Sequence, residues 1–475
     1  MKKFLLISIC FLMTLLTASP SYAVEYTLEE LLEIAQKEST PVSSILKEID
    51  NLKLDLEILK SNYNPKFFLN GQSQVFNLEP GSDGVNYSNN GNLSASIKFP
   101  IGLEVLTNGS VSGIFKEKQD YNYSLTLKYP IYPGLKTDST LLQIEGKKQS
   151  LSKAQWTLKE KELEAYIQVW KKFYLTLITK EKLQLAKETL EQVTEDLNLY
   201  KRLYLRGDIT QRDLLTKEIE YKSALISWEQ NNQQYLSSLK DLLNFVGIEL
   251  NGLTDKELEK INLKGTLDRI REIKLVPFDK LKSVEEMKEE AIKNNVSYNE
   301  ARLKLLDAEE ELKRLYYTRG PKVDSQFEYK LVSGQNVGKS QWTFTVNLSY
   351  QLGDGGKLAL EIEKQTRLID DLKSSLTDAE FVIIDELQNR LTNIKIAYLD
   401  YQKAQLEYEK ALLDQNLKKE QYNKGMITES QLVSGERLLK NKELDYLQKK
   451  IEYQVNYWEL NKFVYLEIKP DGVVE

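Results

Sequence analysis

The stretch from Gln341 to Gln351 has the sequence QWTFTVNLSYQ and changes between polar and apolar at every position. In an extended chain, the apolar residues of this run therefore share one face: Trp342, Phe344, Val346, Leu348 and Tyr350. The length matches the roughly 9–11 residues that a tilted strand needs to cross a bilayer. An apolar outer face with a polar inner face is typical of a water-filled membrane barrel. A soluble sheet with one wet face would alternate in the same way, so the strands alone leave both interpretations open.

Other runs repeat this alternation. Run 121–131 alternates tyrosine and leucine with asparagine, serine and threonine. In run 322–331 the polar face carries charges that would line water inside a barrel: Lys322, Asp324, Glu328 and Lys330. Strand-like runs 92–99 and 109–115, which we expect to join through 107–109, predict an extra hairpin in the first half. This hairpin either adds two strands to the barrel or forms an extracellular excursion.

The chain contains an internal repeat. Thr27–Glu30 returns as Ser283–Glu286 at an offset of 256 residues, and the stretch around Gly207 returns around Gly425 at an offset of 218. The difference of 38 residues places the extra hairpin in the first half. Each half therefore predicts short helices, strands, a very long helix, a glycine turn and another helix.

The long helices are the second signature of the fold. Segments 136–204 and 355–424 contain no proline, and their apolar residues recur at three-and-four spacing. About 70 residues correspond to roughly 100 Å of helix at 1.5 Å per residue. A helix of this length needs coiled-coil-like contact with other helices, and we expect the abundant tyrosines to pack between them.

Composition excludes most enzyme chemistry. The 475 residues include no histidine and one cysteine, Cys10, so histidine zinc sites, Ser-His-Asp triads and disulfide frameworks are excluded. The net charge of -6 gives no basic surface for nucleic acid. No nucleotide-binding GxxxxGK[ST] motif is present, and 353–357 is expected to be a strand-to-helix turn. We therefore predict no enzymatic activity, no cofactor and no metal site.

The N-terminus predicts export. Lys2 and Lys3 precede an uncharged apolar run, and Ser21-Tyr22-Ala23 is a small-x-small cleavage site. A membrane anchor is the competing interpretation, but the run is shorter than the ~20 residues of a spanning helix. Removal of 1–23 takes away two lysines, which leaves a mature chain of net charge -8 without cysteine.

The strand count predicts an assembly. Four to six strands cannot close a membrane barrel, since the smallest need about eight. Open edges would leave backbone groups unpaired in lipid. Several copies of the chain must therefore share one barrel, with the long helices continuing away from the membrane.

These features together resemble the TolC-type outer-membrane efflux proteins over nearly all of the mature chain. The resemblance rests on the repeat, on Pro65 and Pro321 before the strands, on the exit 129–134, and on the turns at Gly207 and Gly425. It implies a mixed α/β membrane protein in which a long α-helical coiled-coil barrel joins a shared trimeric transmembrane β-barrel. Each chain would supply four strands, or six if the extra hairpin joins.

The resemblance also implies the function. The protein would be a homotrimeric outer-membrane exit duct of a tripartite efflux or type I secretion system, with its helices in the periplasm. A periplasmic adaptor protein would connect it to an inner-membrane pump of the RND, ABC or MFS type, and outer-membrane lipid would surround the barrel. Protein secretion is the alternative to small-molecule efflux, and an exported soluble coiled-coil scaffold is the alternative from another class.

The expected division of the chain follows the repeat. Its segments are a signal peptide (1–23), short helices (24–64), barrel strands with the extra hairpin (65–134), a long helical hairpin (135–246), a linker or equatorial belt (247–282), short helices (283–320), barrel strands (321–354), a second long helical hairpin (355–466) and a tail (467–475).

The resemblance places two kinds of site at the helix turns. Adaptor docking is expected at two tips: Gly207, Asp208, Ile209 and Thr210, and Gly425, Met426, Ile427 and Thr428. Thr210 and Thr428 are expected to cap the following helices. The candidate gate residues are Asp213, Tyr422, Glu429, Gln431 and Ser434. Gln431 and Ser434 replace the two aspartates of the family's constriction, and Ile427 replaces a latch arginine, so a closed state would be held differently here.

Overall fold

The computed structural model describes residues 25–77, 85–114, 120–134, 138–248, 250, 254–334, 337–465 and 467. The predicted signal peptide and the predicted tail after 467 lie outside these residues. The elements in chain order are β1 (Glu25–Thr27), α2 (Leu28–Glu38), α3 (Thr40–Lys60), η1 (Ser61–Tyr63), β2 (Lys66–Asn77), β3 (Val85–Lys98), β4 (Glu104–Ile114), β5 (Asp120–Tyr132), α4 (Ser139–Arg206), α5 (Gln211–Val246), α6 (Asp255–Leu258), β6 (Asn262–Lys264), α7 (Asp268–Glu272), η3 (Phe278–Lys280), α8 (Val284–Asn294), α9 (Val296–Arg319), β7 (Lys322–Gly334), β8 (Val337–Ser349), α10 (Lys357–Asn423) and α11 (Glu429–Tyr465).

The chain divides into two compact units. The helical unit comprises residues up to 46, 157–295 and from 383 onward, and the sheet unit comprises 47–156 and 296–382. Both long helices, α4 and α10, contribute to each unit. Each unit takes segments from both halves of the repeat, so neither half forms a unit of its own.

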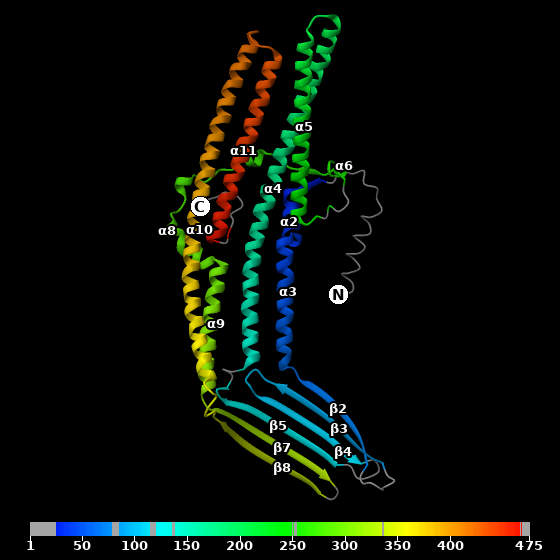
Figure 1. Ribbon diagram of the computed structural model, residues 1–475, viewed down its shortest axis with the longest axis vertical. Helices are drawn as coiled ribbons and strands as arrows, with labels where there is room; N and C mark the ends of the chain where they lie inside the picture. Colours follow the sequence, from blue (N-terminus) through cyan, green and yellow to red (C-terminus); the bar gives the residue numbers. More distant parts are fainter. Residues whose placement is uncertain are drawn as a thin grey trace. The chain divides into compact units, whose positions relative to one another are not determined.

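The sheet unit contains one antiparallel sheet of six strands in the order β2-β3-β4-β5-β7-β8 (Figure 1). The extra hairpin, β3–β4, lies between β2 and β5 within this sheet. The hairpin is therefore part of the same continuous sheet as the other four strands.

The predicted turn of this hairpin at 107–109 is wrong. Those residues lie inside β4, where Asn108 is opposite Ser94 and Gly109 is opposite Leu93. The connection runs instead through 99–103, where the N–H of Phe99 donates to the carbonyl of Leu103 at 2.8 Å. Asn-Gly is a strong local turn signal, but pairing with two neighbouring strands keeps this one extended.

The long proline-free segments form α4, of 68 residues, and α10, of 67 residues, as predicted. The expected strand-to-helix turn before α10 is also confirmed. Asp354 accepts hydrogen bonds from the N–H groups of Gly356 and Leu358, at 2.9 and 2.8 Å. These bonds to backbone N–H groups lower the pKa of Asp354 and satisfy donors that a helix start leaves free.

The first repeated motif is a capping box. Thr27 precedes α2, and its N–H donates to Glu30 Oε2 at 2.8 Å while the N–H of Glu30 donates to the Thr27 hydroxyl at 3.2 Å. Ser283 and Glu286 form the same pair before α8, at 2.9 and 3.4 Å. The repeat preserves this motif because it starts the same helix in each half.

The core of the helical unit joins its distant segments. Fully buried side chains come from α2, α4, α5 and α11, and they include Leu31, Phe173, Leu239 and Ile451. The segment between the halves packs on this core through Ile270, which is also fully buried. It also supplies β6, which pairs in parallel with the N-terminal strand β1.

Candidate functional site

One face of the six-stranded sheet carries apolar side chains on every strand. The strand register places Leu69 of β2 opposite Leu93 of β3, and Phe327 of β7 opposite Phe344 of β8. The predicted lipid-facing side chains are on this face and are exposed in the single chain: Trp342 (69%), Phe344 (60%), Val346 (54%) and Leu348 (71%). Tyr350 is also exposed and lies one residue beyond β8. At the end of β5 a bulge between Pro130 and Tyr132 takes Ile131 out of this ladder.

The opposite face is mainly polar, although Phe68, Leu106 and Val332 also lie on it. Its rows contain paired amides and hydroxyls, such as Asn70 opposite Asn92 and Asn108 opposite Ser124. The predicted water-lining charges lie on this face, and Lys330 forms an ion pair with Glu328 at 3.0 Å. A sheet with these two faces separates hydrocarbon from water if its edges are closed.

The two long helical hairpins of the helical unit turn at glycine. Gly207 has φ +81° and Gly425 has φ +69°, a left-handed conformation that side chains with a Cβ disfavour. At each turn two hydrogen bonds close the preceding helix: Gly207 to Tyr204 and Asp208 to Leu203 in the first, Gly425 to Tyr422 and Met426 to Gln421 in the second. This is the Schellman arrangement, and it reverses the chain within a few residues.

Both turns lead into the predicted threonine caps. The hydroxyl and N–H of Thr210 donate to Asp213 Oδ2 at 2.7 and 3.1 Å, and these bonds lower the pKa of Asp213. At the second turn, the N–H of Thr428 donates to Gln431 Oε1 at 2.9 Å, and the N–H of Gln431 donates to the Thr428 hydroxyl at 3.4 Å. The two caps thus have one geometry, with a carboxylate in the first and a neutral amide in the second.

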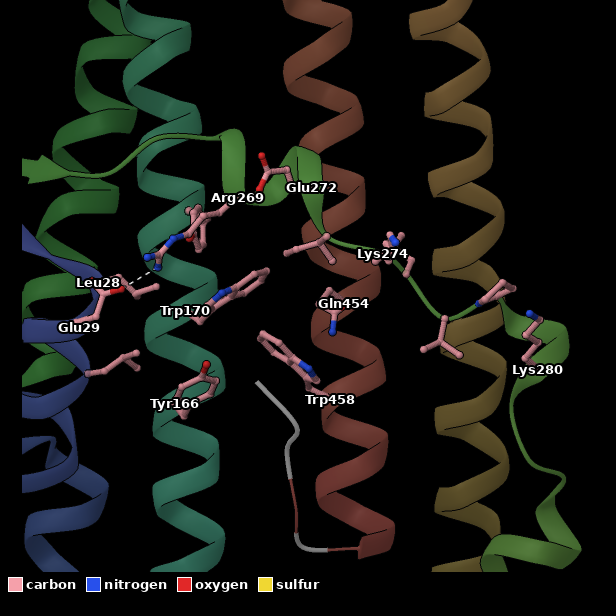
Figure 2. Close-up of a pocket in the computed structure, with 16 residues that line it drawn as sticks. Leu28, Glu29, Tyr166, Trp170, Arg269, Glu272, Lys274, Lys280, Gln454 and Trp458 are labelled. Carbon is pink, nitrogen blue, oxygen red and sulfur yellow. Dashed lines mark hydrogen bonds and ion pairs between the residues drawn. The ribbon is translucent and has the colours of Figure 1, made fainter. Parts of the chain in front are cut away.

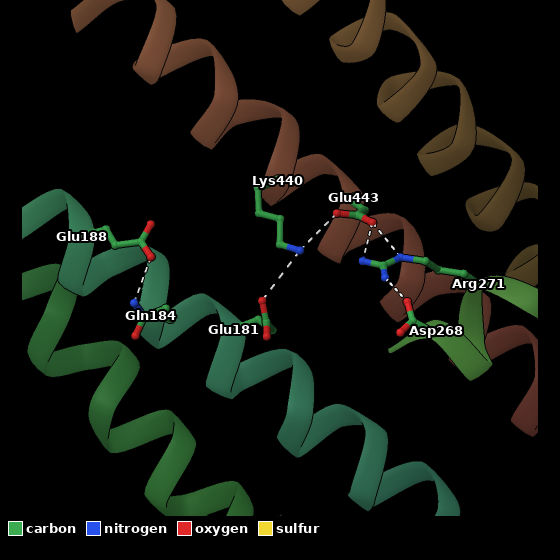
Figure 3. A network of polar contacts seen from close by, with 7 residues as sticks. All are labelled: Glu181, Gln184, Glu188, Asp268, Arg271, Lys440 and Glu443. Carbon is green, nitrogen blue, oxygen red and sulfur yellow. Dashed lines mark hydrogen bonds and ion pairs between the residues drawn. The ribbon is translucent and has the colours of Figure 1, made fainter. Parts of the chain in front are cut away.

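A polar network fixes α11 to α4 and to the segment between the halves (Figure 3). Lys440 of α11 lies 3.7 Å from Glu181 of α4 and 3.3 Å from Glu443. Glu443 also pairs with Arg271 of α7 at 2.7 Å, and Arg271 pairs in turn with Asp268. These groups are partly exposed, so we expect the network to fix how α11 lies against α4 and α7 more than to stabilise the fold.

Comparison with known proteins agrees with this geometry. Residues 89–247 match the family model described as outer membrane efflux protein. The chain has the fold of outer-membrane channels. The solved structures similar to it include the CmeC outer membrane channel of Campylobacter jejuni (TM-score 0.63, 14% identity, covering 92% of this chain and 85% of that one) and the open state of the MtrE outer membrane channel of Neisseria gonorrhoeae (TM-score 0.58, 14% identity, covering 96% and 95%). A third is the outer membrane protein VceC of Vibrio cholerae (TM-score 0.57, 11% identity, covering 92% and 96%). No curated protein sequence matches the chain.

These findings confirm the resemblance to outer-membrane efflux proteins that the sequence predicted, and they agree with the predicted outer-membrane location. The matching segment includes β4, β5 and the whole first helical hairpin. The family description names an efflux protein.

Four of the predicted gate residues, Asp213, Glu429, Gln431 and Ser434, lie near the starts of α5 and α11, and the fifth, Tyr422, lies at the end of α10. Asp213 and Gln431 are engaged in the caps, and Ser434 donates its hydroxyl to the carbonyl of Gln431 at 2.9 Å. Glu429 is the first residue of α11, and Tyr422 precedes the glycine of the second turn. Their role as a gate stays a prediction.

The tip residues fill the connections between the paired helices. Gly207, Asp208, Ile209 and Thr210 separate α4 from α5. Gly425, Met426, Ile427 and Thr428 lie between α10 and α11. Two large apolar side chains at these tips are strongly exposed, Leu205 at 85% and Met426 at 70%. Leu205 was not among the predicted docking residues. The helical spacing of apolar residues does not show which face of a helix is covered by another helix and which is exposed.

The sequence did not predict a cavity of about 1170 Å³ in the helical unit (Figure 2). Trp170 of α4 and Trp458 of α11 meet edge to face inside it, with ring centroids 4.6 Å apart. Arg269 donates to Glu29 Oε1 at 2.8 Å on its wall. The indole N–H of Trp458 is buried and has no hydrogen-bond partner among the described residues.

The tyrosines pack between helices as expected. Tyr398 and Tyr401 of α10 contact Tyr453 of α11, with ring centroids 5.2 and 6.3 Å away. Tyr408 stacks on Tyr446 at 5.7 Å. Within the described residues, no group of three or more acidic or cysteine side chains is arranged to hold a metal ion.

None of the described helices is both long enough and apolar enough to cross a membrane.

Proposed function

We propose that this protein is the outer-membrane exit duct of a tripartite efflux or type I secretion system. Three copies would form one channel through which substrates pass without chemical change. The observation that carries this proposal is the sheet in which all six strands place apolar side chains on one face while the opposite face is mainly polar. A soluble scaffold would have no reason to expose Trp342, Phe344 and Leu348 on one face of an edge strand.

The two helical hairpins are the proposed contact with the rest of the system. Their turns are closed by Schellman bonds and threonine caps, which satisfy backbone groups that the helix ends would otherwise leave free. The exposed Leu205 and Met426 provide apolar anchors for a periplasmic adaptor, which connects the duct to an inner-membrane pump. Energy for transport would come from that pump.

A gate at the two helix turns would have one ring of carboxylates instead of two. Asp213 keeps a carboxylate at the first turn, whereas Gln431 has a neutral amide at the equivalent place. Three copies of Asp213 would form an acidic rim that attracts cations. Divalent block of the channel current, and its loss in Asp213→Asn, tests this role.

The decisive experiment is the mass and conductance of the detergent-extracted mature protein. We expect a trimer that needs detergent for extraction and gives discrete conductance steps in a planar bilayer. A water-soluble monomer without conductance would overturn the duct and favour the exported coiled-coil scaffold.

A further inference from the structure

The sheet unit ends in two open edges. β2 and β8 are the outer strands of the six-stranded sheet, and neither has a second strand neighbour among the described residues. They are similar in length, at 12 and 13 residues. Because β8 is five antiparallel steps from β2, an odd number, the two edges run in opposite directions and can pair in antiparallel fashion.

The chain itself contains a template for this pairing. Inside one copy, β5 ends the strands of the first half and pairs with β7, which begins those of the second half. By the repeat, β2 corresponds to β7 at an offset of 256, since Pro65-Lys66 matches Pro321-Lys322. β8 corresponds to β5 at an offset of 219, the distance from Gly134 to Gly353. A junction of β8 with β2 from another copy would therefore repeat the junction of β5 with β7.

We propose that β8 of one copy pairs with β2 of the next in this register, and that each copy contributes all six strands to the closed wall. The pair Tyr129–Ser325 then becomes Leu348 opposite Leu69, and Lys128–Gln326 becomes Asn347 opposite Asn70. These two pairs join leucines on the apolar face and amides on the polar face, and the next apolar side chains of β8, Val346 and Phe344, come opposite the small residues Gly71 and Ser73. A shift of one residue would place each side chain opposite the wrong face.

If three copies pair in this way, the barrel has a wide pore. This conclusion about the pore rests on the proposed trimeric duct. Three copies would give eighteen strands in place of twelve. With strands about 4.8 Å apart and tilted by about 40°, the backbone radius grows from about 12 Å to about 18 Å. The polar face of β3 and β4 would then line water like that of the other four strands.

Disulfide cross-linking tests the register, because the sequence has no cysteine after Cys10. The double variant Asn70→Cys/Asn347→Cys, oxidised in the membrane and denatured without reductant, should give covalent multimers up to a closed ring. The matched control Asn70→Cys/Thr343→Cys keeps the same face but moves one partner by about 13 Å, and it should stay monomeric. Cross-linking of the control in place of the designed pair, in a channel that still conducts, would overturn the register and leave the duct intact.

Thiol labelling tests the wall position of the extra hairpin. Ser110 of β4 lies on the polar face opposite Asn122, and the next residue, Val111, lies on the apolar face opposite Tyr121. A membrane-impermeant methanethiosulfonate reagent should lower the single-channel current of Ser110→Cys in up to three steps and leave Val111→Cys unchanged. An unchanged current in both variants of a conducting channel would remove β3 and β4 from the wall. Absence of conductance in the unmodified protein would instead overturn the duct itself.

Discussion

Replacement of Phe344 by arginine is the sharpest test of which face of the sheet meets lipid. Phe344 lies near the middle of β8, is 60% exposed in the single chain and is opposite Phe327 on the apolar face. An arginine on the lipid side of a barrel costs about 2–4 kcal/mol near the bilayer midplane. This corresponds to a roughly 30- to 700-fold lower ratio of folded to unfolded protein.

The neighbouring residue provides the matched control. Thr345 lies on the polar face opposite Gln326, so Thr345→Arg adds the same side chain to the same strand on the water side. The measurement is the free energy of unfolding by denaturant in lipid vesicles, followed by circular dichroism. We expect Phe344→Arg to lose the amount given above and Thr345→Arg to lose less than about 1 kcal/mol. Equal losses in the two variants, or no loss in either, would refute the assignment of the faces.

Three further predictions concern the helical unit. Thr210→Ala and Thr428→Ala should each destabilise the start of the following helix by about 1 kcal/mol. The measurement is amide hydrogen exchange, which should become faster at residues 211–213 or 429–431. Unchanged exchange would show that the caps do not stabilise these helix starts. The hydrogen bonds from Thr210 lower the pKa of Asp213, so the cap is fully formed above the ordinary carboxyl pKa and is lost as pH falls through the lowered value. Asp213→Asn should remove this acid dependence of amide exchange. The cap at Gln431 contains a neutral amide, so exchange there should not depend on acid even in the unmodified protein. Burial lowers the pKa of Lys450 from 10.5 to about 8. Between these two pH values the unfolded chain binds more protons than the folded one, so the free energy of unfolding should rise with pH. Lys450→Met should flatten this rise in melting temperatures measured over a pH series, and an equal rise in both proteins would exclude Lys450 as its source.

Local rules account for most of the elements. Alternation at every second residue predicted β5, β7 and β8, and proline-free three-and-four spacing predicted α4 and α10. The caps at Thr210 and Thr428 follow from the chemistry of a hydroxyl next to free N–H groups. These features depend on residues within a few positions of each other, so the sequence displays them directly.

The same rules failed where contacts with residues far away in the chain decide the local structure. Asn108-Gly109 has the composition of a hairpin turn, yet both residues are paired in β4 because β3 and β5 flank them. The packing of Trp170 against Trp458 joins residues of α4 and α11, and the Arg271–Glu443 ion pair joins α7 to α11. No periodicity within one segment contains this information.

The sequence by itself determined the long helices, the alternating strands β5, β7 and β8, the repeat, and the two opposite faces of those strands, because these follow from backbone geometry and from local hydrogen bonding. Only the tertiary structure decided that β3 and β4 lie inside the sheet between β2 and β5, and that β2 and β8 are its edges. The physical reason is that strand order is set by hydrogen bonds between backbones, which every residue can make, and by which apolar faces then become continuous.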